Sequence, residues 1–276
     1  MKMRLAITGA LALLGTVTAW AADAGLPQAI KDKGFLNAGI MPNYPPMDFK
    51  DPATNQLTGV DYDLGMEIGK RLGITVKWQE TAFEQMVSSL VTQRLDIVLS
   101  GMTDTAERQK TVDFVDYFRT GPQFYVMESN KSIVSVSDLC GKKVGTSRRT
   151  TFPAEIAKWS AANCEAKGLP AIQVTGTDGS ADARAQLRQA RLDAAVQGSE
   201  TLPYIQSQEP GAYRVIGEPL TTQLTGLGVS KNNPGLSAAI VDALNAMIAD
   251  GTYAQILKKW DLERGAVDKA VMNSGT

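Results

Sequence analysis

Two short stretches of the chain combine arginine side chains with hydroxyl groups and with backbone that favours anion binding. The first, SRRTTFP (147–153), follows a strand-like run and precedes a helix-like run, so it is typical of a turn that opens a helix. Such a turn presents free N–H groups and the positive end of a helix dipole, and Arg148 and Arg149 add positive charge. The second, SGMTDTAER (100–108), ends in Arg108, whose planar guanidinium can hold a carboxylate through two parallel hydrogen bonds. Both stretches indicate a site for a small anion.

The composition excludes several kinds of catalytic site. The 276 residues include no histidine, which removes Ser-His-Asp and Cys-His nucleophile systems and histidine-based metal sites. Two cysteines cannot build a tetrahedral thiolate site, so we expect no metal ion and no cofactor. The formal net charge is −1 and there is no basic tail, which argues against nucleic acid as a partner.

The N-terminus has the organisation of a secretory signal peptide. It begins MKMR, continues with an apolar run of about a dozen residues, and has small residues at Ala19 and Ala21. We place the signal peptide at 1–21, with cleavage after Ala21. A membrane anchor is the alternative, but the apolar run is shorter than the roughly 20 residues that a membrane span needs. The sequence therefore predicts export to the periplasm.

The two cysteines, Cys140 and Cys164, are predicted to form a disulfide because an exported protein can keep one. The loop that it would close spans about 25 residues, which corresponds to roughly 3 kcal/mol of stabilisation in the chain-entropy model. Two free, buried thiols are the alternative.

Strand-like and helix-like stretches alternate along the chain, which predicts an α/β fold of parallel strands covered by helices. The roughly 255 residues that follow cleavage exceed the usual size of a single core, so we expect two lobes. We assign residues 26–122 and 223–265 to the first lobe and 123–222 to the second, so that the chain crosses between them twice. Residues 266–276 are expected to form a flexible tail.

Six motifs occur in a characteristic order. They are YPPM (44–47), LTGVDYDLGMEIGKRLG (57–73), LDIVLSGMTDTAERQKTVDFVDYF (95–118), SDLCGKKVG (137–145), RLDAAVQ (191–197) and ADGTYAQILKKW (249–260). In order and spacing they resemble the family 3 solute-binding proteins of bacterial ABC importers, and the resemblance covers nearly the whole mature chain. It implies a type II periplasmic-binding-protein fold, in which two α/β lobes joined by a two-strand hinge close over a ligand. It also implies a monomer that binds polar amino acids and delivers them to the membrane permease of an ABC importer.

The resemblance assigns roles to residues of the first lobe. In the family, the residues that match Gly101, Thr103 and Arg108 hold the α-carboxylate of the ligand, and Ser100 backs this site. The alternative for Arg108 is a solvated helix charge. We interpret Thr105 as the N-cap of the helix that carries Arg108.

Aromatic residues of the family hold the ligand's side chain between them, and they match Tyr44 and Phe83 here. Core packing is the alternative for both. In the second lobe the family commonly has a glycine followed by a threonine that meets the carboxylate. Thr150 matches this pattern, whereas Arg149 stands in place of the glycine and adds positive charge.

A larger departure follows the RLDAAVQ motif, where the family commonly has an aspartate that accepts the ligand's α-ammonium. This chain has Gly198 there. Burying an ammonium without an acceptor costs several kcal/mol. Either Glu200 replaces that aspartate, or the ligand has no α-ammonium in the usual place and Gln197 and Ser199 bond to a neutral group.

We therefore expect a receptor rather than an enzyme. Its ligand would be a small carboxylate: an amino acid, acidic or atypical, or an organic acid without an α-amine. One alternative is a cyclohexadienyl dehydratase on the same scaffold, which expels water and CO2 from prephenate or arogenate, with Glu200 as general acid. A sensory module that presents its ligand to a membrane receptor is another.

Overall fold

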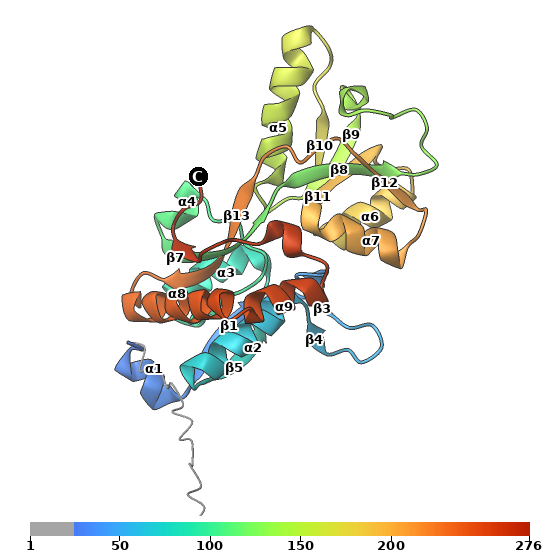
Figure 1. Cartoon of the computed structure of the whole chain (residues 1–276). Helices are drawn as coiled ribbons and strands as arrows, with labels where there is room; N and C mark the ends of the chain where they lie inside the picture. Colours follow the sequence, from blue (N-terminus) through green and yellow to red (C-terminus); the bar gives the residue numbers. More distant parts are fainter. Residues whose placement is uncertain (1–24) are drawn as a thin grey trace, which may run out of the picture.

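The computed structural model describes residues 25–276 and has two α/β lobes, which form the lower and upper parts of Figure 1. Each lobe is built on its own sheet, and helices pack against both sheets. The predicted fold class is confirmed. The predicted signal peptide at 1–21 and its cleavage site lie outside the described residues.

The first lobe contains a six-stranded sheet with the order β14-β7-β13-β6-β1-β5. Its strands are β1 (Phe35–Ile40), β5 (Thr75–Glu80), β6 (Ile97–Val98), β7 (Val112–Thr120), β13 (Gln223–Ser230) and β14 (Val271–Met272). Strand β1 pairs in parallel with β5 and β6, and β13 pairs antiparallel with β6 and β7. A small sheet beside it consists of β2 (Asn43–Tyr44), β3 (Asp48–Lys50) and β4 (Leu57–Thr58).

The second lobe contains a five-stranded sheet with the order β10-β9-β11-β8-β12. Its strands are β8 (Pro122–Met127), β9 (Lys143–Ser147), β10 (Gln173–Thr177), β11 (Ala194–Gly198) and β12 (Tyr213–Ile216). The three strands β10, β9 and β11 are parallel, whereas β8 runs antiparallel to β11 and β12.

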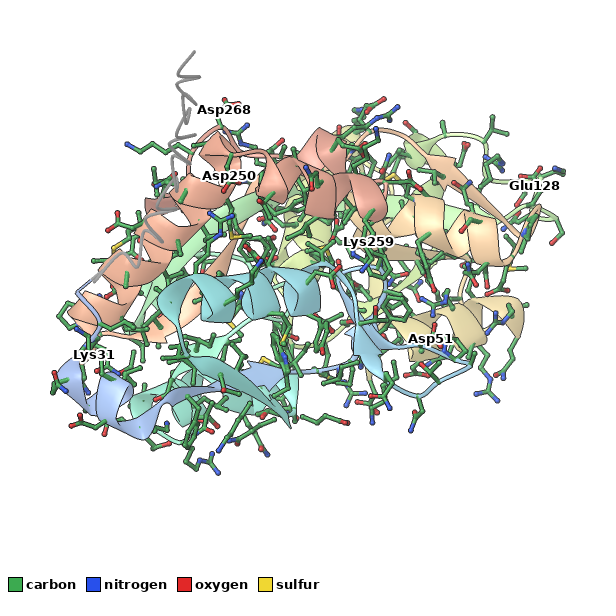
Figure 2. All side chains as sticks on the ribbon, turned by 60° about the horizontal axis from the view of Figure 1, so that its bottom comes forward. Lys31, Asp51, Glu128, Asp250, Lys259 and Asp268 are labelled. Atoms are coloured by element: carbon green, nitrogen blue, oxygen red, sulfur yellow. A yellow bond between two sulfur atoms is a disulfide. The ribbon has the colours of Figure 1, made fainter. Side chains whose placement is uncertain are left out.

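The helices follow the apolar periodicity of the sequence. They are α1 (Gln28–Lys33), α2 (Val60–Leu72), α3 (Met86–Val91), α4 (Ala106–Gln109), α5 (Phe152–Asn163), α6 (Ser180–Arg188), α7 (Leu202–Gln208), α8 (Pro234–Ala249) and α9 (Thr252–Lys259). Helix α2 buries Leu64 and Ile68, and the adjacent α8 buries Ile240 and Leu244, because residues three or four apart share one helix face. Other charged side chains lie at the surface, and Figure 2 shows Lys31 and Asp268 at the periphery of the molecule.

The chain crosses between the lobes twice, and the two crossings touch. It passes from β7 to β8 through Gly121 and returns across residues 217–222 between β12 and β13. The N–H of Leu220 donates to the carbonyl oxygen of Pro122 at 2.8 Å. A Cβ at Gly121 would stand 1.7 Å from the carbonyl oxygen of Thr221, so only glycine permits this close approach.

The C-terminal segment is held against the first lobe, which corrects the expectation of a flexible tail at 266–276. Strand β14 pairs antiparallel with β7, and Val267 and Ala270 are buried. The N–H groups of Ser274 and Gly275 donate to the carboxylates of Asp116 and Asp104, at 3.0 and 2.7 Å. The expectation rested on the segment's position at the end of the chain, whereas its backbone N–H groups find buried acceptors in the first lobe.

The predicted disulfide is present between Cys140 and Cys164, with a Cα–Cα distance of 5.5 Å. It ties the segment before β9 to the residue that ends α5, so it closes the strand and helix on either side of the SRRTTFP turn into one covalent loop. Within residues 25–276, no helix is long and apolar enough to cross a membrane, and no cluster of acidic or cysteine side chains is arranged to hold a metal ion.

Asp104 and Asp116 form a buried carboxyl pair beneath the C-terminal segment. Burial, and to a smaller extent the negative charge of Asp104, raises the pKa of Asp116 to about 7. Because the folded pKa lies above the unfolded value, the group stabilises the fold at low pH, and this contribution is lost as the pH rises through about 7.

We predict that Asp116→Asn increases the free energy of unfolding at pH 8 by on the order of 4 kcal/mol and leaves it nearly unchanged at pH 3, below the pKa of the unfolded carboxyl. The asparagine amide can donate to Asp104 as the protonated acid does. Urea unfolding at the two pH values measures the difference. Asp113→Asn, on the same strand but paired with Lys231 at 3.4 Å, is the control and should show no gain at pH 8. An equal effect of Asp116→Asn at both pH values would contradict the assignment.

Candidate ligand-binding site

A cavity of about 260 Å³ lies between the two lobes. The carboxyl ends of parallel strands from both sheets open onto it: Met41 follows β1, Ser100 follows β6, Ser147 ends β9 and Asp178 follows β10. Crevices at such strand ends are the usual binding sites of α/β sheets, because the loops there diverge and leave room for a ligand.

All but one of the predicted ligand residues line this cavity. The first lobe contributes Tyr44, Phe83, Ser100, Gly101, Thr103 and Arg108, and the second contributes Arg149, Thr150 and Gln197. Sequence positions more than 150 residues apart therefore meet at one site. The exception is Glu200.

Arg108 is the cation that the cavity holds most firmly. Its backbone N–H donates to the Thr105 hydroxyl at 3.2 Å, which confirms Thr105 as the N-cap of α4. The guanidinium donates to the carbonyl oxygen of Thr103 at 2.7 Å and lies 5.6 Å from the centre of the Phe83 ring. No carboxylate of residues 25–276 lies within 4.0 Å of it. Burial lowers the pKa of Arg108, yet a guanidinium remains charged, so an anion is needed to complete the site.

Ser100 and Gly101 form a wall of the cavity and are themselves anchored from behind. The Ser100 hydroxyl donates to Asp48 at 3.2 Å and accepts from the N–H of Met41 at 3.0 Å. The N–H of Gly101 donates to Asp61 at 2.7 Å. These donors already have partners, so the two residues shape the wall, and a ligand anion takes its hydrogen bonds from other groups.

Asp48 and Asp61 are both 0% exposed and interact electrostatically behind this wall. Burial raises the pKa of Asp48 well above its usual range and that of Asp61 to about 7. Tyr117 donates its hydroxyl to Asp61 at 2.5 Å. The pair therefore shares a proton near neutral pH and fixes the backbone of the Ser100–Gly101 wall.

The SRRTTFP turn closes on itself as it opens α5. The Thr150 hydroxyl donates to the carbonyl oxygen of Ser147 at 2.8 Å and accepts from the N–H of Phe152 at 3.2 Å. Arg148 and Arg149 both border the cavity, and Arg148 pairs with the exposed Asp178 at 3.0 Å. The turn thus brings both arginines to the cavity, where the charge of Arg148 is balanced by an ion pair.

Gln197 presents an unused donor to the cavity. Its side chain is 2% exposed, and its Oε1 faces a guanidinium nitrogen of Arg184 at 3.4 Å. Its Nε2 is buried without a hydrogen-bond partner in the described part of the chain. A ligand oxygen would satisfy it, because a buried amide without a partner loses free energy.

Comparisons with known proteins agree with this geometry. The model of bacterial extracellular solute-binding proteins, family 3, matches residues 36–263. The chain belongs to this family. It is 28% identical to the arginine-binding protein ArgT of Corynebacterium glutamicum, over 91% of this chain and 82% of that protein. It is 29% identical to the L-cystine-binding protein TcyJ of Escherichia coli, over 94% and 97%.

Solved structures of two similar proteins share the two-lobed fold of this solute-binding protein. A mutant of ArgBP from T. maritima superimposes with a TM-score of 0.76 and 30% identity, covering 85% of this chain and 98% of that one. The ancestral amino acid-binding protein AncCDT-1, described as a precursor of cyclohexadienyl dehydratase, has a TM-score of 0.73 and 31% identity, covering 84% and 98%.

Sequence reasoning missed the part of the solute-binding protein's cavity that α6 contributes. Gly179 and Ser180 line the cavity at the start of this helix, and the Ser180 hydroxyl donates across the cleft to the carbonyl oxygen of Asn43 at 3.1 Å. The signal was present in the sequence, because a Gly-Ser pair follows the strand-like AIQVTGT run and precedes a helix-like run, as in the SRRTTFP turn.

Glu200 was predicted to contact the ligand, but its carboxylate lies behind Tyr44 and does not line the cavity. It accepts from the Tyr44 hydroxyl at 2.8 Å and from the Thr120 hydroxyl. The prediction was one of two alternatives, in which Glu200 reaches in to replace the aspartate that the family commonly has at position 198. A 3₁₀ turn over Ser199–Thr201 instead folds the side chain back beneath the strand end.

We predict that Arg108→Ala abolishes the thermal stabilisation that a bound carboxylate gives the solute-binding protein, with at least a hundredfold loss of affinity, because a buried charge pair is removed. Arg108→Lys keeps the charge but not the planar fork and should lose about tenfold. Arg148→Ala is the matched control and should lose less than about threefold, because Arg148 pairs with Asp178. Calorimetry measures affinity, and melting of the unliganded variants checks the fold. Near-normal binding by Arg108→Ala would refute the assignment.

Proposed function

We propose that the protein is a periplasmic receptor that encloses a small carboxylate, an α-amino acid, between its lobes and delivers it to the permease of an ABC importer. The observation that carries the proposal is the guanidinium of Arg108, which lines the interlobe cavity without a carboxylate partner among residues 25–276. A ligand carboxylate would supply that partner.

The charges around the cavity are suited to a ligand that is a zwitterion. Arg108 and Arg149 border the cavity, and the buried carboxyl groups of Asp48, Asp61 and Glu200 lie behind its wall. An α-ammonium beside Ser100 and Tyr44 would face those carboxyl groups, while the α-carboxylate would face Arg108. Burial raises the pKa of Asp61 and of Glu200, and a nearby cation would favour their ionised forms. The names of the arginine- and cystine-binding relatives are consistent with an amino acid ligand.

The side chain of the ligand would meet hydrogen-bond donors in the second lobe. Gln197 offers an amide N–H, and Arg149 offers a cation at the cavity border. A carbonyl or carboxylate oxygen on the ligand's side chain would match both. Acidic residues at the cavity are Glu84, which is exposed, and Asp178, which Arg148 neutralises.

A dehydratase receives less support from the geometry. Its general acid would have to reach the substrate. Glu200, the acid expected for this role, does not line the cavity. AncCDT-1 is itself described as an amino acid-binding protein.

The test is a ligand screen of the purified wild-type protein by thermal melting and calorimetry. The panel contains L-arginine, L-histidine, L-cystine, L-glutamate and L-glutamine, together with the amine-free acids succinate and 2-oxoglutarate. We expect an amino acid to raise the melting temperature by several degrees, since saturation at about a thousand times Kd adds roughly 4 kcal/mol. Its amine-free analogue should not.

Stabilisation by amine-free acids alone would refute the amino acid assignment and retain the carboxylate site. Stabilisation by no member of the panel would refute both. Incubation with prephenate separates the dehydratase, because turnover by the wild type would show that the protein is an enzyme.

A further inference from the structure

Tyr44 belongs to the first lobe, but its hydroxyl group bonds to the second. The ring lines the cavity, and a Cβ at Gly101 would stand 3.1 Å from it, so ring and loop are in contact. The hydroxyl donates to Oε1 of Glu200 at 2.8 Å and accepts from the N–H of Gly198 at 3.2 Å. One phenol therefore spans the cleft and has both a donor and an acceptor in the opposite lobe.

Glu200 is placed to receive this hydroxyl. It lies in the 3₁₀ turn that follows β11 and is 8% exposed. Its second oxygen, Oε2, accepts from the hydroxyl of Thr120, the last residue of β7 before the chain crosses between lobes. The carboxylate thus joins the cavity wall of the first lobe, the first crossing and the end of a strand in the second lobe.

This arrangement requires glycine at position 198. A Cβ at residue 198 would stand 2.3 Å from each carboxylate oxygen of Glu200 and 2.3 Å from the Tyr44 hydroxyl oxygen. Non-bonded atoms do not approach a Cβ this closely, so any side chain at residue 198 would displace both partners. The missing side chain at 198 leaves the space that the Glu200 carboxylate and the Tyr44 hydroxyl occupy.

The Glu200 carboxylate is screened from the ligand cavity by its partner. Tyr44 and Gln197 line the cavity between the lobes, whereas Glu200 and Ser199 line a separate cavity of about 330 Å³ behind the crossings. A ligand in the first cavity would touch the Tyr44 ring, and the carboxylate would act on the ligand only through that ring and at a distance.

We infer that Glu200 is a positioning residue, which holds Tyr44 as a wall of the ligand site when the lobes are closed, and that Gly198 leaves the space this requires. The inference rests on the proposed function of the cavity as a ligand site. Because Tyr44 and Glu200 belong to different lobes, opening the cleft breaks their contact. Closure and the shape of the ligand site are therefore linked through one hydroxyl group.

The test compares Tyr44→Phe, Glu200→Ala, Glu200→Gln and the double variant Tyr44→Phe/Glu200→Ala. Affinity and dissociation rate are measured with L-arginine, L-histidine and L-glutamate. We expect Tyr44→Phe and Glu200→Ala each to lose about tenfold in affinity through faster dissociation, and the double variant to lose no more than either. Glu200→Gln should remain within about threefold, because its amide oxygen still accepts from Tyr44 and its amide N–H can donate to Thr120.

A direct ligand contact of Glu200 would give the opposite pattern. Glu200→Gln would then lose as much as Glu200→Ala, and the losses of Tyr44→Phe and Glu200→Ala would multiply in the double variant. Either result overturns the inference. Gly198→Ala provides a second route to the same contact, since it leaves both partners in the chain and should reproduce the loss seen in Glu200→Ala. Wild-type affinity in Gly198→Ala would also contradict the inference.

A readout without ligand separates this inference from the proposed function. The N–H of Gly198 donates to Tyr44 in the closed form, and the unliganded protein exchanges between open and closed forms. The closed fraction protects this N–H, so its hydrogen exchange should be faster in Tyr44→Phe than in the wild type, as resolved by NMR. Equal exchange rates would show that the contact does not form and would overturn the inference. If the wild type binds none of the three amino acids, these ligands are excluded for the proposed function, while the exchange comparison still decides whether Tyr44 reaches the second lobe.

Discussion

The guanidinium of Arg108 needs a negative partner, and this need organises the cleft. It is half-buried at the interlobe cavity, its hydrogen bond to the carbonyl oxygen of Thr103 leaves its charge unbalanced, and the described chain offers no carboxylate in contact. An unpaired, partly buried charge costs free energy, so under the proposed function a ligand anion would favour the closed form. Binding and closure would then be one event, because the ligand would complete a site that neither lobe completes alone.

The two sheets provide the rigid frame of the cleft. Parallel strands of both lobes end at the cleft, so the short segments after β1, β6, β9 and β10 meet there although they are distant in sequence. The paired crossings at Gly121 and Thr221 keep the sheets in contact at one edge, which leaves the opposite side of the cleft to open. Hinge motions of this kind concentrate their backbone changes in a few residues between rigid bodies.

Buried carboxyl groups support the loops of the first lobe from behind. Asp48 and Asp61 hold the wall formed by Ser100 and Gly101, and Asp104 and Asp116 hold the C-terminal segment. Burial disfavours the charged forms of Asp61 and Asp116, and it raises the pKa of each to about 7. The same groups that order the site therefore make the protein less stable as the pH rises.

Much of this protein could be read from local patterns. Helical and strand periodicity predicted the two α/β lobes, and the resemblance of the SGMTDTAER stretch to the family 3 motif implied that Thr103 and Arg108 belong to the cleft. The disulfide between Cys140 and Cys164 followed from the context of export. Such signals depend on neighbours along the chain, whose spacing is set by the backbone geometry of helices and strands.

The contacts behind the cavity wall could not be predicted from local sequence patterns. Tyr44 and Glu200 are 156 positions apart, and the meeting of their side chains depends on how two sheets are set against each other. The direction of the Glu200 side chain depends on a 3₁₀ turn, and the polar C-terminal segment is ordered by Asp104 and Asp116, which are distant in sequence. The sequence by itself determined the lobes and the strand-end loops, because these follow from local periodicity and turn chemistry, and its family motif indicated the arginine of the cleft. Only the tertiary structure decided which buried polar groups meet across the lobes, because a buried donor takes whichever acceptor packing brings within reach.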